Sequence, residues 1–309
     1  MLFQQVFTGY LKENFVPMLS EVEPFLFKGR SFFVKRDDMI DPLLSGNKYR
    51  KLFTLIQTSP EEYKTIISYG GTQSNAMLSI AALCQQKGWA FDYYSKPVPD
   101  HLKRQVSGNL KAALDLGMSL HEVAHDMYET TLTKLKTSTD ESTLVIPQGG
   151  ADPIAEQGIR KLAEEIKTWH AGHQEALNIV TPSGTGTTAY YLALALPNAK
   201  VFTTPSVGDS AYLEKQMLQL GELPLNLNVL EPKKKYHFGK PYPEFLDIYL
   251  ALKDAGITFD LIYAPKMWQT LLANMQNIQG TILYVHSGGI LGNETMLERY
   301  QHKGLYPQL

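Results

Sequence analysis

One stretch of the chain is the most informative about its fold, and it reads Ser45-Gly46-Asn47-Lys48-Tyr49-Arg50-Lys51-Leu52. The glycine turn leads into a predicted helix, which places Lys48 in the first helical turn and Lys51 one turn later on the same side. Because the positive end of the helix dipole opposes a lysine charge there, we expect a lowered pKa for the Lys48 amine. Such a lysine suits reaction with a carbonyl group, whereas the alternative is a solvated basic helix start.

A second segment joins the end of an apolar strand to the start of a helix, and it reads Tyr69-Gly70-Gly71-Thr72-Gln73-Ser74-Asn75. Its glycines allow the backbone to turn tightly and to approach a ligand. Ser74 and Asn75 would then present a hydroxyl and an amide at the mouth of the helix. The simpler alternative, which this segment alone favours, is that Ser74 only caps the helix.

A threonine-rich loop, Thr181-Pro182-Ser183-Gly184-Thr185-Gly186-Thr187-Thr188, follows the predicted strand that ends at Val180. A predicted helix from Ala189 to Leu196 comes next. Free backbone amides, hydroxyl donors and the helix dipole make such a loop suitable for phosphate. It lacks the lysine of the nucleoside-triphosphate loop and the three-glycine spacing of the dinucleotide fingerprint. We therefore expect a small monophosphate, bound by Ser183, Gly184, Thr185, Gly186, Thr187 and Thr188.

Short apolar runs rich in β-branched residues alternate with segments of helical length along the chain. The expected strands include 32–34, 65–69, 144–146, 177–180, 200–202 and 281–285. Most of them are continuously apolar, which is typical of parallel strands covered on both faces. The clearest helix begins at Asp152-Pro153 and carries on one face Ile159, Leu162, Ala163 and Ile166. This alternation predicts an α/β fold with ligands bound at the carboxyl ends of the strands.

The composition limits the class of protein. The chain has 309 residues, an apolar content of 44% and a formal net charge of −2. Its length fits two domains, and neither nucleic acid nor an acidic membrane surface is an expected partner. The single cysteine, Cys84, leaves no internal disulfide or multi-cysteine metal site, and no metal is expected. No signal peptide begins at Met1–Gln5 and no apolar stretch is long enough to span a bilayer, so we expect a cytoplasmic protein.

A reactive lysine, a monophosphate loop and a serine–asparagine pair at a strand end together suit a phosphorylated aldehyde. The chain also resembles the 1-aminocyclopropane-1-carboxylate deaminase/D-cysteine desulfhydrase family in segments that occur in the family's order. These are Lys35-Arg36-Asp37-Asp38, residues 46–52, residues 70–75, Pro147-Gln148-Gly149-Gly150, the threonine-rich loop and His286-Ser287-Gly288-Gly289. The resemblance extends from about residue 15 to residue 300 and so covers essentially the whole chain.

The resemblance implies the tryptophan-synthase-β-like fold of pyridoxal phosphate enzymes, with two three-layer α/β/α domains and mainly parallel sheets. A larger cofactor-binding domain would comprise residues 1–50 and 148–309, and a smaller α/β domain, residues 51–147, would be inserted into it. Turn chemistry places the crossover at residues 149–153. The active site would lie in the cleft between the domains, and the protein would be a homodimer.

The resemblance also implies which residues bind the cofactor. Lys48 would hold pyridoxal phosphate covalently and move the α-proton of the substrate. Lys51 and the threonine-rich loop would bind the phosphate, and Asn75 would hydrogen-bond the phenolate oxygen of the cofactor. Ser287 would meet the pyridine nitrogen.

Three further residues would act on a small amino-acid substrate. Ser74 would meet its carboxylate, with Asn75 beside it. Tyr263, at the end of an expected strand, matches the family's active-site tyrosine. Tyr242 is the counterpart of a second family tyrosine and is expected to contact the substrate.

Two positions distinguish the two activities of the family. The residue after the active-site tyrosine is a glutamate in the deaminases, and here it is Ala264. Ser287 offers the pyridine nitrogen only a neutral hydroxyl, as in the desulfhydrases. A weaker electron sink favours loss of a good leaving group such as thiolate, so we expect an α,β-eliminating lyase/deaminase of the D-cysteine desulfhydrase type. Its products would be pyruvate, ammonia and sulfide.

Other activities remain open on the sequence alone. The first alternative is a 1-aminocyclopropane-1-carboxylate deaminase. β-Replacement and racemisation follow, because enzymes of the same fold with those activities would share the lysine and the phosphate loop. Non-catalytic cofactor binding is a further alternative, because Ala76-Met77-Leu78-Ser79 stands where the family has more polar residues. A nicotinamide dehydrogenase is the least favoured, because the chain lacks the dinucleotide fingerprint with its downstream acid.

Overall fold

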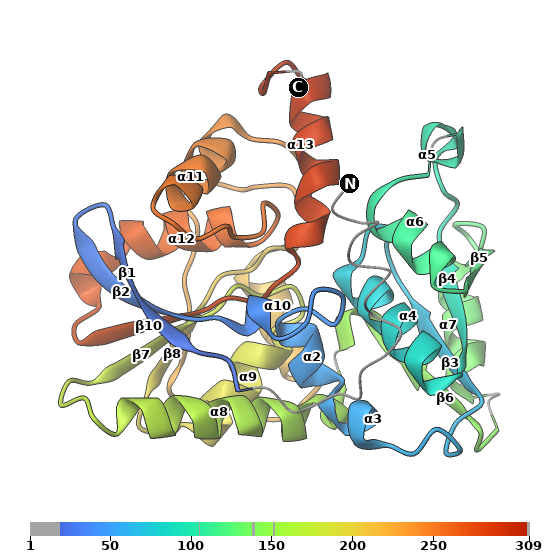
Figure 1. The fold of residues 1–309 in the computed structure, drawn as a ribbon, viewed down its shortest axis with the longest axis horizontal. Helices are drawn as coiled ribbons and strands as arrows, with labels where there is room; N and C mark the ends of the chain where they lie inside the picture. The colour runs from blue at the N-terminus through green and yellow to red at the C-terminus, as the bar shows by residue number, and fades with distance from the viewer. Residues whose placement is uncertain (1–18, 105, 138–139, 151, 308–309) are drawn as a thin grey trace.

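The structure is a computed structural model that describes residues 19–104, 106–137, 140–150 and 152–307. The predicted absence of a signal peptide at Met1–Gln5 and the start of the family resemblance near residue 15 lie outside these residues. The described chain forms a six-stranded sheet and a four-stranded sheet, each flanked by helices (Figure 1).

The six-stranded sheet has the order β1-β2-β10-β7-β8-β9. A hairpin of two antiparallel strands forms one edge, and the other neighbouring strands pair in parallel. The strands are β1 (Val22–Phe27), β2 (Arg30–Lys35), β10 (Thr281–Val285), β7 (Leu177–Val180), β8 (Lys200–Thr203) and β9 (Leu227–Val229).

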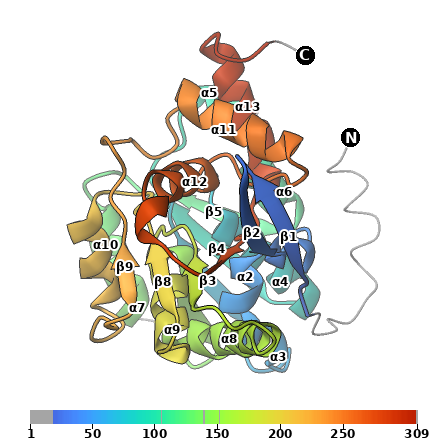
Figure 2. The same cartoon turned by 90° about the vertical axis from the view of Figure 1, so that its left-hand side faces the viewer.

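Helices cover both faces of this sheet, as Figure 2 shows. One face carries α8 (Glu156–His170) and α9 (Thr187–Ala195), and the other carries α11 (Pro243–Asp254) and α12 (Ala264–Ala273). Consecutive strand residues point to opposite faces: Ile179 packs with α8 and α9, whereas Val180 packs with α11 and α12. A strand that is buried on both sides needs apolar residues at every position, which explains its continuous apolar run.

The four-stranded sheet has the order β5-β4-β3-β6, and all of its strands are parallel. The strands are β3 (Thr65–Tyr69), β4 (Ala90–Ser95), β5 (Met118–Glu122) and β6 (Thr143–Ile146). Helices α4 (Asn75–Lys87) and α6 (Gly108–Asp115) pack on one face, and α7 (Tyr128–Thr137) packs on the other. The predicted α/β class with two mainly parallel sheets is therefore confirmed.

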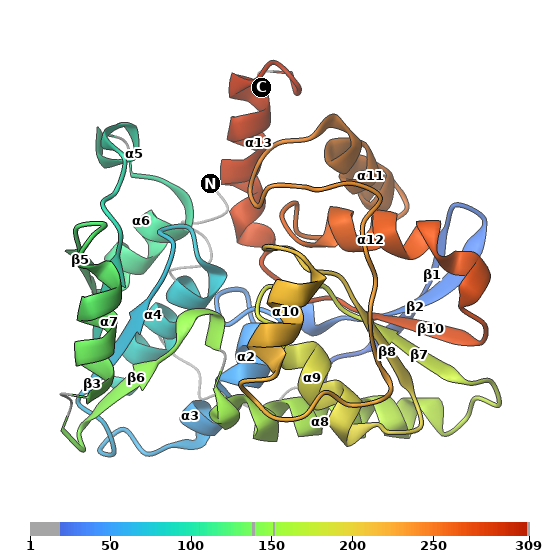
Figure 3. The same cartoon turned by 180° about the vertical axis from the view of Figure 1, so that it is seen from behind.

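The remaining helices are short or lie at the edges of the sheets. They are α2 (Asn47–Lys51), α3 (Phe53–Gln57), α5 (Asp100–Arg104), α10 (Ser210–Met217) and α13 (Asn293–His302). The 3-10 turns are η2 (Asp37–Met39), η3 (Gln148–Gly150), η4 (Pro153–Ala155), η5 (Met275–Asn277) and η6 (Ile290–Gly292). Helix α2 lies between the two sheets, and Figure 3, which shows the molecule from behind, has α10 at the front.

The predicted division into two domains and the predicted helix start at Asp152-Pro153 can be compared with these elements. The strands of the smaller sheet all fall between Thr65 and Ile146, and those of the larger sheet fall outside that range. The exact domain limits stay a prediction. The larger predicted domain also contains residues 1–18, 151 and 308–309, which lie outside the described part of the chain. The helix expected at Asp152-Pro153 begins as the turn η4, whose first amide is capped by the Asp152 side chain, and continues as α8. None of the helices in the described residues has the length and apolar content needed to cross a membrane.

Candidate functional site

Helix α2 begins against the turn that follows β10. Gly46 has φ 57°, and a Cβ at this position would overlap the carbonyl group of Ser287. The Asn47 amide donates to that carbonyl at 3.2 Å. A left-handed residue packed against backbone must be glycine, which explains why glycine stands directly before this helix. The contact places the start of α2, the helix that carries Lys48, next to Ser287.

Lys48 is half-buried and its Nζ donates to Asn47 Oδ1 at 2.9 Å. Desolvation lowers the pKa of the Lys48 amine to about 8, and the negative charge of Asp260 acts in the opposite direction. The direction agrees with the prediction from sequence, but the cause is different. Helix α2 has only five residues, and burial rather than a helix dipole is the largest effect.

Asp260 is a buried carboxylate near Lys48 that sequence reasoning did not assign. The amides of Ile262 and Tyr263 donate to its Oδ1 at 3.1 and 2.5 Å. Burial raises the pKa of Asp260 to about 6, against the lowering effect of these amides and of Lys48. An aspartate shortly before a helix that has proline in its first turn is a common cap signal, and this pattern could have identified Asp260 as a cap.

Tyr263 directly precedes helix α12 and does not end a strand, so the expected strand at this position is wrong. The segment turns here because Asp260 binds consecutive backbone amides. Tyr263 is half-buried, and desolvation raises the pKa of its hydroxyl. A Cβ added at Gly184 would lie 3.5 Å from Tyr263 Cε1, so the tyrosine ring contacts the threonine-rich loop.

Lys51 extends from α2 toward the same loop. Its Nζ donates to the Gly149 carbonyl oxygen at 2.9 Å and to Thr185 Oγ1 at 3.5 Å. The side chain is buried, and desolvation followed by the charge of Lys48 lowers the pKa of Lys51 well below its usual value. The two lysines and the loop are therefore brought together, as the sequence predicted.

The threonine-rich loop passes into α9 after Gly186, which has φ 79°, so its last two residues, Thr187 and Thr188, form the start of that helix. A Cβ at Gly186 would overlap Met217. Thr188 Oγ1 is buried and has no hydrogen-bond partner among the described residues. Thr185 and Thr187 share a hydroxyl–hydroxyl hydrogen bond of 2.9 Å. The loop thus presents an available hydroxyl at a helix N-terminus.

Ser183 forms its hydrogen bonds with residues at and after the end of β8. Its Oγ accepts a hydrogen bond of 2.6 Å from Thr203 Oγ1, and its backbone bonds to Thr204 and Ser206. These contacts hold the loop against the end of β8. Ser183 therefore has a structural partner that the sequence did not predict.

Ser74 and Asn75 lie at the start of α4, as predicted. Ser74 Oγ accepts a hydrogen bond of 3.3 Å from the Met77 amide and so caps the helix. Asn75 Oδ1 accepts a hydrogen bond of 2.8 Å from Asn109 Nδ2. A Cβ at Gly289 would overlap Asn75 Nδ2, which places the Asn75 amide beside the turn after β10.

Ser287 lies in that turn, and its Oγ is buried without a hydrogen-bond partner in the described chain. The turn is held by His286, whose Nδ1 accepts from the Gly288 amide at 3.1 Å and whose Nε2 lies 2.9 Å from the Thr258 carbonyl oxygen. Ala264, the residue that replaces the deaminase glutamate, is buried at the start of α12.

Tyr242 is not brought to this group by any contact in the described structure. Its Oη accepts a hydrogen bond of 3.0 Å from the His237 amide, and its ring centroid lies 4.9 Å from that of Tyr236. Phe238, in the same segment, lies 5.5 Å from Tyr263 between ring centroids. The substrate contact expected for Tyr242 stays a prediction.

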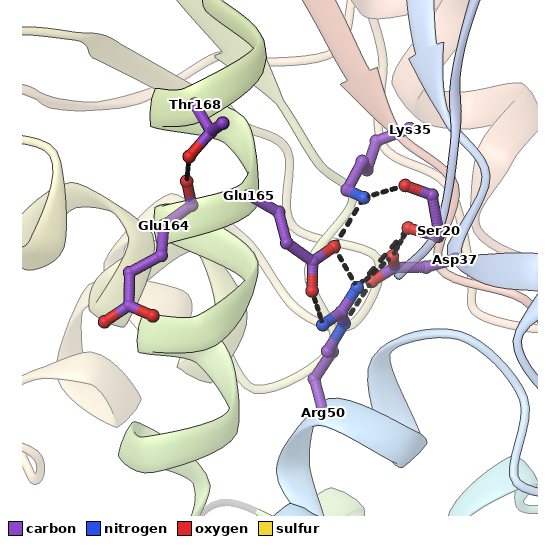
Figure 4. A network of polar contacts seen from close by, with 7 residues as sticks. All are labelled: Ser20, Lys35, Asp37, Arg50, Glu164, Glu165 and Thr168. Carbon is purple, nitrogen blue, oxygen red and sulfur yellow. Dashed lines mark hydrogen bonds and ion pairs between the residues drawn. The ribbon is translucent and has the colours of Figure 1, made fainter. Parts of the chain in front are cut away.

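A buried ion network anchors α2 through Arg50 (Figure 4). Arg50 donates to Asp37 at 2.8 and 3.0 Å and to Glu165 at 2.6 Å. Lys35 donates to Glu165 Oε2 at 2.6 Å. Sequence reasoning matched Lys35 and Asp37 to the family without a role. The structure shows that they hold the helix that carries Lys48 against β2 and α8.

The comparisons with known proteins agree with this architecture. No protein-family model matches the chain. A protein of Thermotoga maritima named "Putative 1-aminocyclopropane-1-carboxylate deaminase" is 26% identical over 85% of this chain and 90% of its own length. A D-cysteine desulfhydrase of Yersinia pestis is 26% identical over 94% of this chain and 97% of its own length. The crystal structure of an "ACC deaminase homologue" superposes with a TM-score of 0.72 at 21% identity and covers 96% of this chain and 98% of that one.

These similarities confirm the resemblance to the 1-aminocyclopropane-1-carboxylate deaminase/D-cysteine desulfhydrase family, which depends on pyridoxal phosphate. The fold is the tryptophan-synthase-β-like fold of such enzymes. Both activities are named among these relatives, and an identity of 26% does not decide between them, so the choice depends on the site.

Proposed function

We propose that this relative of the 1-aminocyclopropane-1-carboxylate deaminase/D-cysteine desulfhydrase family is a pyridoxal phosphate-dependent lyase acting on a small amino acid. Its reaction would be of the D-cysteine desulfhydrase type, with pyruvate, ammonia and sulfide as products. The observation that carries the choice of reaction is the buried, unpartnered Ser287 Oγ beside the helix of Lys48. Ser287 would offer the pyridine nitrogen a neutral hydroxyl, and Ala264, which stands in place of the deaminase glutamate, adds no negative charge.

The chemistry of the donors fits the cofactor. Thr188 Oγ1 and Ser287 Oγ are buried without partners among the described residues, and a buried hydroxyl left unpaired is costly. A phosphate at the start of α9 would accept from Thr188, from free backbone amides and from the Lys51 side chain, and its negative charge would favour the protonated form of that lysine. A pyridine nitrogen would accept from Ser287. Each unpaired donor would thereby gain a partner.

Lys48 would supply the reactive amine. With a pKa of about 8, roughly a tenth of its amines are unprotonated at pH 7, whereas an ordinary lysine would have far fewer. The unprotonated Nζ is the form that bonds to an aldehyde carbon and takes a proton from the α-carbon of a substrate. Bound pyridoxal phosphate supplies the electron sink for the pair which that proton leaves behind.

Ser74 and Asn75 would orient the substrate and the cofactor. Ser74 Oγ accepts from the Met77 amide, so its hydroxyl hydrogen is left to donate to a carboxylate. The N-terminus of α4 adds a favourable dipole for that anion. Asn75 Nδ2 has no hydrogen bond within the described residues and would donate to the phenolate oxygen of the cofactor.

A neutral partner at the ring nitrogen limits the reaction. Without a carboxylate there, a low-dielectric site disfavours the protonated ring, which weakens its capacity to accept electrons. Asp260, the buried carboxylate near Lys48, uses its Oδ1 to accept from the amides before α12. Elimination then requires a β-substituent that leaves readily, such as thiolate or chloride, which disfavours the opening of a cyclopropane ring.

A panel of substrates tests the proposal. Pyruvate release from D-cysteine, L-cysteine and β-chloroalanine would be compared with 2-oxobutanoate release from 1-aminocyclopropane-1-carboxylate, with Lys48→Ala as the inactive control. We expect pyruvate from D-cysteine or β-chloroalanine and little 2-oxobutanoate. Ring opening that exceeds elimination from D-cysteine would instead establish a deaminase. Cofactor binding without turnover of any of these compounds would contradict the lyase proposal.

A further inference from the structure

We propose that Asn109 is a positioning residue that fixes the side-chain amide of Asn75 with its nitrogen free to meet the cofactor's phenolate oxygen. The inference rests on the proposed function, because it concerns the orientation of a proposed cofactor ligand. Asn109 is the second residue of α6, and 1% of its surface is exposed. It lies 34 positions from Asn75 in sequence and contacts it directly.

The orientation of the Asn75 side-chain amide follows from which atoms donate and which accept in two hydrogen bonds of Asn109. Asn109 Nδ2 donates to the Gln73 carbonyl oxygen at 3.1 Å and to Asn75 Oδ1 at 2.8 Å. A backbone carbonyl can only accept, so the Asn109 atom that faces Gln73 must be the amide nitrogen. The second hydrogen of that nitrogen needs an acceptor, which requires Asn75 to present its oxygen to Asn109. The Asn75 nitrogen must then lie on the other side.

Gln73 closes the arrangement. Its Oε1 accepts from the Asn109 backbone amide at 3.0 Å, and its Nε2 donates to the Ser107 carbonyl oxygen at 3.1 Å. The residue between Ser107 and Asn109 is Gly108, with φ 61°, where a Cβ would lie 2.7 Å from Gln73 Oε1. The starts of α4 and α6 are thereby locked together, and neither amide can rotate without breaking bonds of the other.

One atom of Asn109 gains nothing from this network. Its Oδ1 is buried and has no hydrogen-bond partner among the described residues. An unpaired buried carbonyl is destabilising, and an apolar side chain would avoid that cost. The amide is therefore explained by its donor side, which acts on Gln73 and Asn75, and not by its contribution to packing.

The free Asn75 nitrogen lies beside Gly289, in the turn that also carries Ser287. A donor at a phenolate oxygen stabilises the ionised form of that oxygen and lowers the pKa of the bound cofactor's chromophore. If the amide were reversed, its oxygen would repel the phenolate. Asn109 would thus set the ionisation of the cofactor without touching it.

Asn109→Asp tests this, because a carboxylate has the same shape but only accepts, so the Asn75 amide must turn to donate to it. The pH titration of the visible absorbance of the cofactor-loaded protein is the readout. We expect the titration midpoint to rise by about one unit. Asn109→Ala, which lacks both amide atoms, should shift it in the same direction by less. Asn178→Asp is the matched control, since Asn178 is also buried and donates to backbone carbonyls, but in β7.

A double-mutant comparison separates positioning from general damage. In an Asn75→Ala background, the uncharged Asn109→Ala should cause no further change in the midpoint, because its effect acts through Asn75. An unchanged midpoint in both Asn109 variants, or an equal additional shift in the Asn75→Ala background, would overturn the inference while the cofactor chromophore still supported the proposed function. A native protein that acquires no chromophore with pyridoxal phosphate would overturn both.

Discussion

Lys51 Nζ lies 3.5 Å from Thr185 Oγ1, although 134 positions separate the two residues. The contact joins α2, which carries Lys48, to the loop that precedes α9. The same nitrogen donates to the Gly149 carbonyl oxygen at 2.9 Å. The amine and the phosphate loop proposed for one cofactor are therefore parts of one site, and the loop can be tested independently of the amine.

Replacing both Thr185 and Thr188 by valine should weaken cofactor retention. Each hydroxyl bond to a phosphate dianion contributes about 1.5–3 kcal/mol, so loss of both should reduce affinity by about a hundredfold or more. The measurement is the cofactor left after dialysis, followed by its visible absorbance. Valine at Thr133 and Thr137, exposed threonines of α7, is the matched control. A Thr185/Thr188 variant that stays fully loaded would place the phosphate elsewhere.

The pKa of Lys48 predicts how the cofactor-free protein captures pyridoxal phosphate. Only the unprotonated amine reacts, and burial lowers its pKa to about 8, so the capture rate should rise with pH around that value. Because the charge of Asp260 raises the pKa of Lys48, Asp260→Asn should move the midpoint to lower pH. The measurement is the rate of colour formation across a pH series.

Asp209→Asn is the control for this change. Asp209 also caps a helix, by accepting from the Tyr212 amide at 2.9 Å, but it lies at the start of α10. Its substitution should leave the midpoint where it is in the native protein. A rise in the midpoint on Asp260→Asn, or equal shifts in both variants, would contradict an electrostatic link between Asp260 and Lys48.

The ion network of Figure 4 should contribute strongly to stability. Glu165→Gln leaves Lys35 and Arg50 with less compensating charge in buried positions, which costs about 3 kcal/mol when one partner of a buried pair is removed. Glu164→Gln is the matched control, because Glu164 is exposed and points away from the network. The free energy of unfolding from urea titration should fall for the first variant and change little for the second. Equal values would contradict the role of the network.

Ala264→Glu should shift the reaction toward ring opening. A carboxylate at this buried position favours the protonated cofactor ring and strengthens its capacity to accept electrons. The ratio of 2-oxobutanoate from 1-aminocyclopropane-1-carboxylate to pyruvate from D-cysteine should rise above that of the native protein. Ala264→Gln, of similar size but uncharged, controls for obstruction of the pocket. The same ratio in the glutamate and glutamine variants would contradict the charge argument.

The sequence predicts strands with a continuous apolar run, and it misses β4, which lies inside its sheet but alternates in exposure, together with the edge strands β1, β5 and β9. β7 and β10 are buried at every residue, so their continuous apolar runs are visible in the sequence. β9 is only partly buried and β5 is buried only at Met118, because each forms the edge of its sheet. Edge strands carry polar residues on their open side, and a search for apolar runs does not find them.

Some residues of the candidate site can be predicted from the sequence and others cannot. Lys48 and the threonine-rich loop stand in local patterns of glycine and hydroxyl residues, which sequence reasoning can identify. Asn109 and Glu165 act through partners 34 and 115 positions away, and no local pattern indicates such contacts. The strand predicted to end at Tyr263 is wrong because a single capping carboxylate, Asp260, turns the backbone there.

The covalent attachment of pyridoxal phosphate to Lys48 is the central claim, and borohydride reduction tests it most directly. Reduction of the loaded protein followed by peptide mass mapping should place the pyridoxyl group on Lys48, and Lys48→Ala should carry no label. Lys51, one turn away and also of lowered pKa, serves as the internal comparison. A pyridoxyl group on Lys51, on any other lysine, or on none would contradict the account.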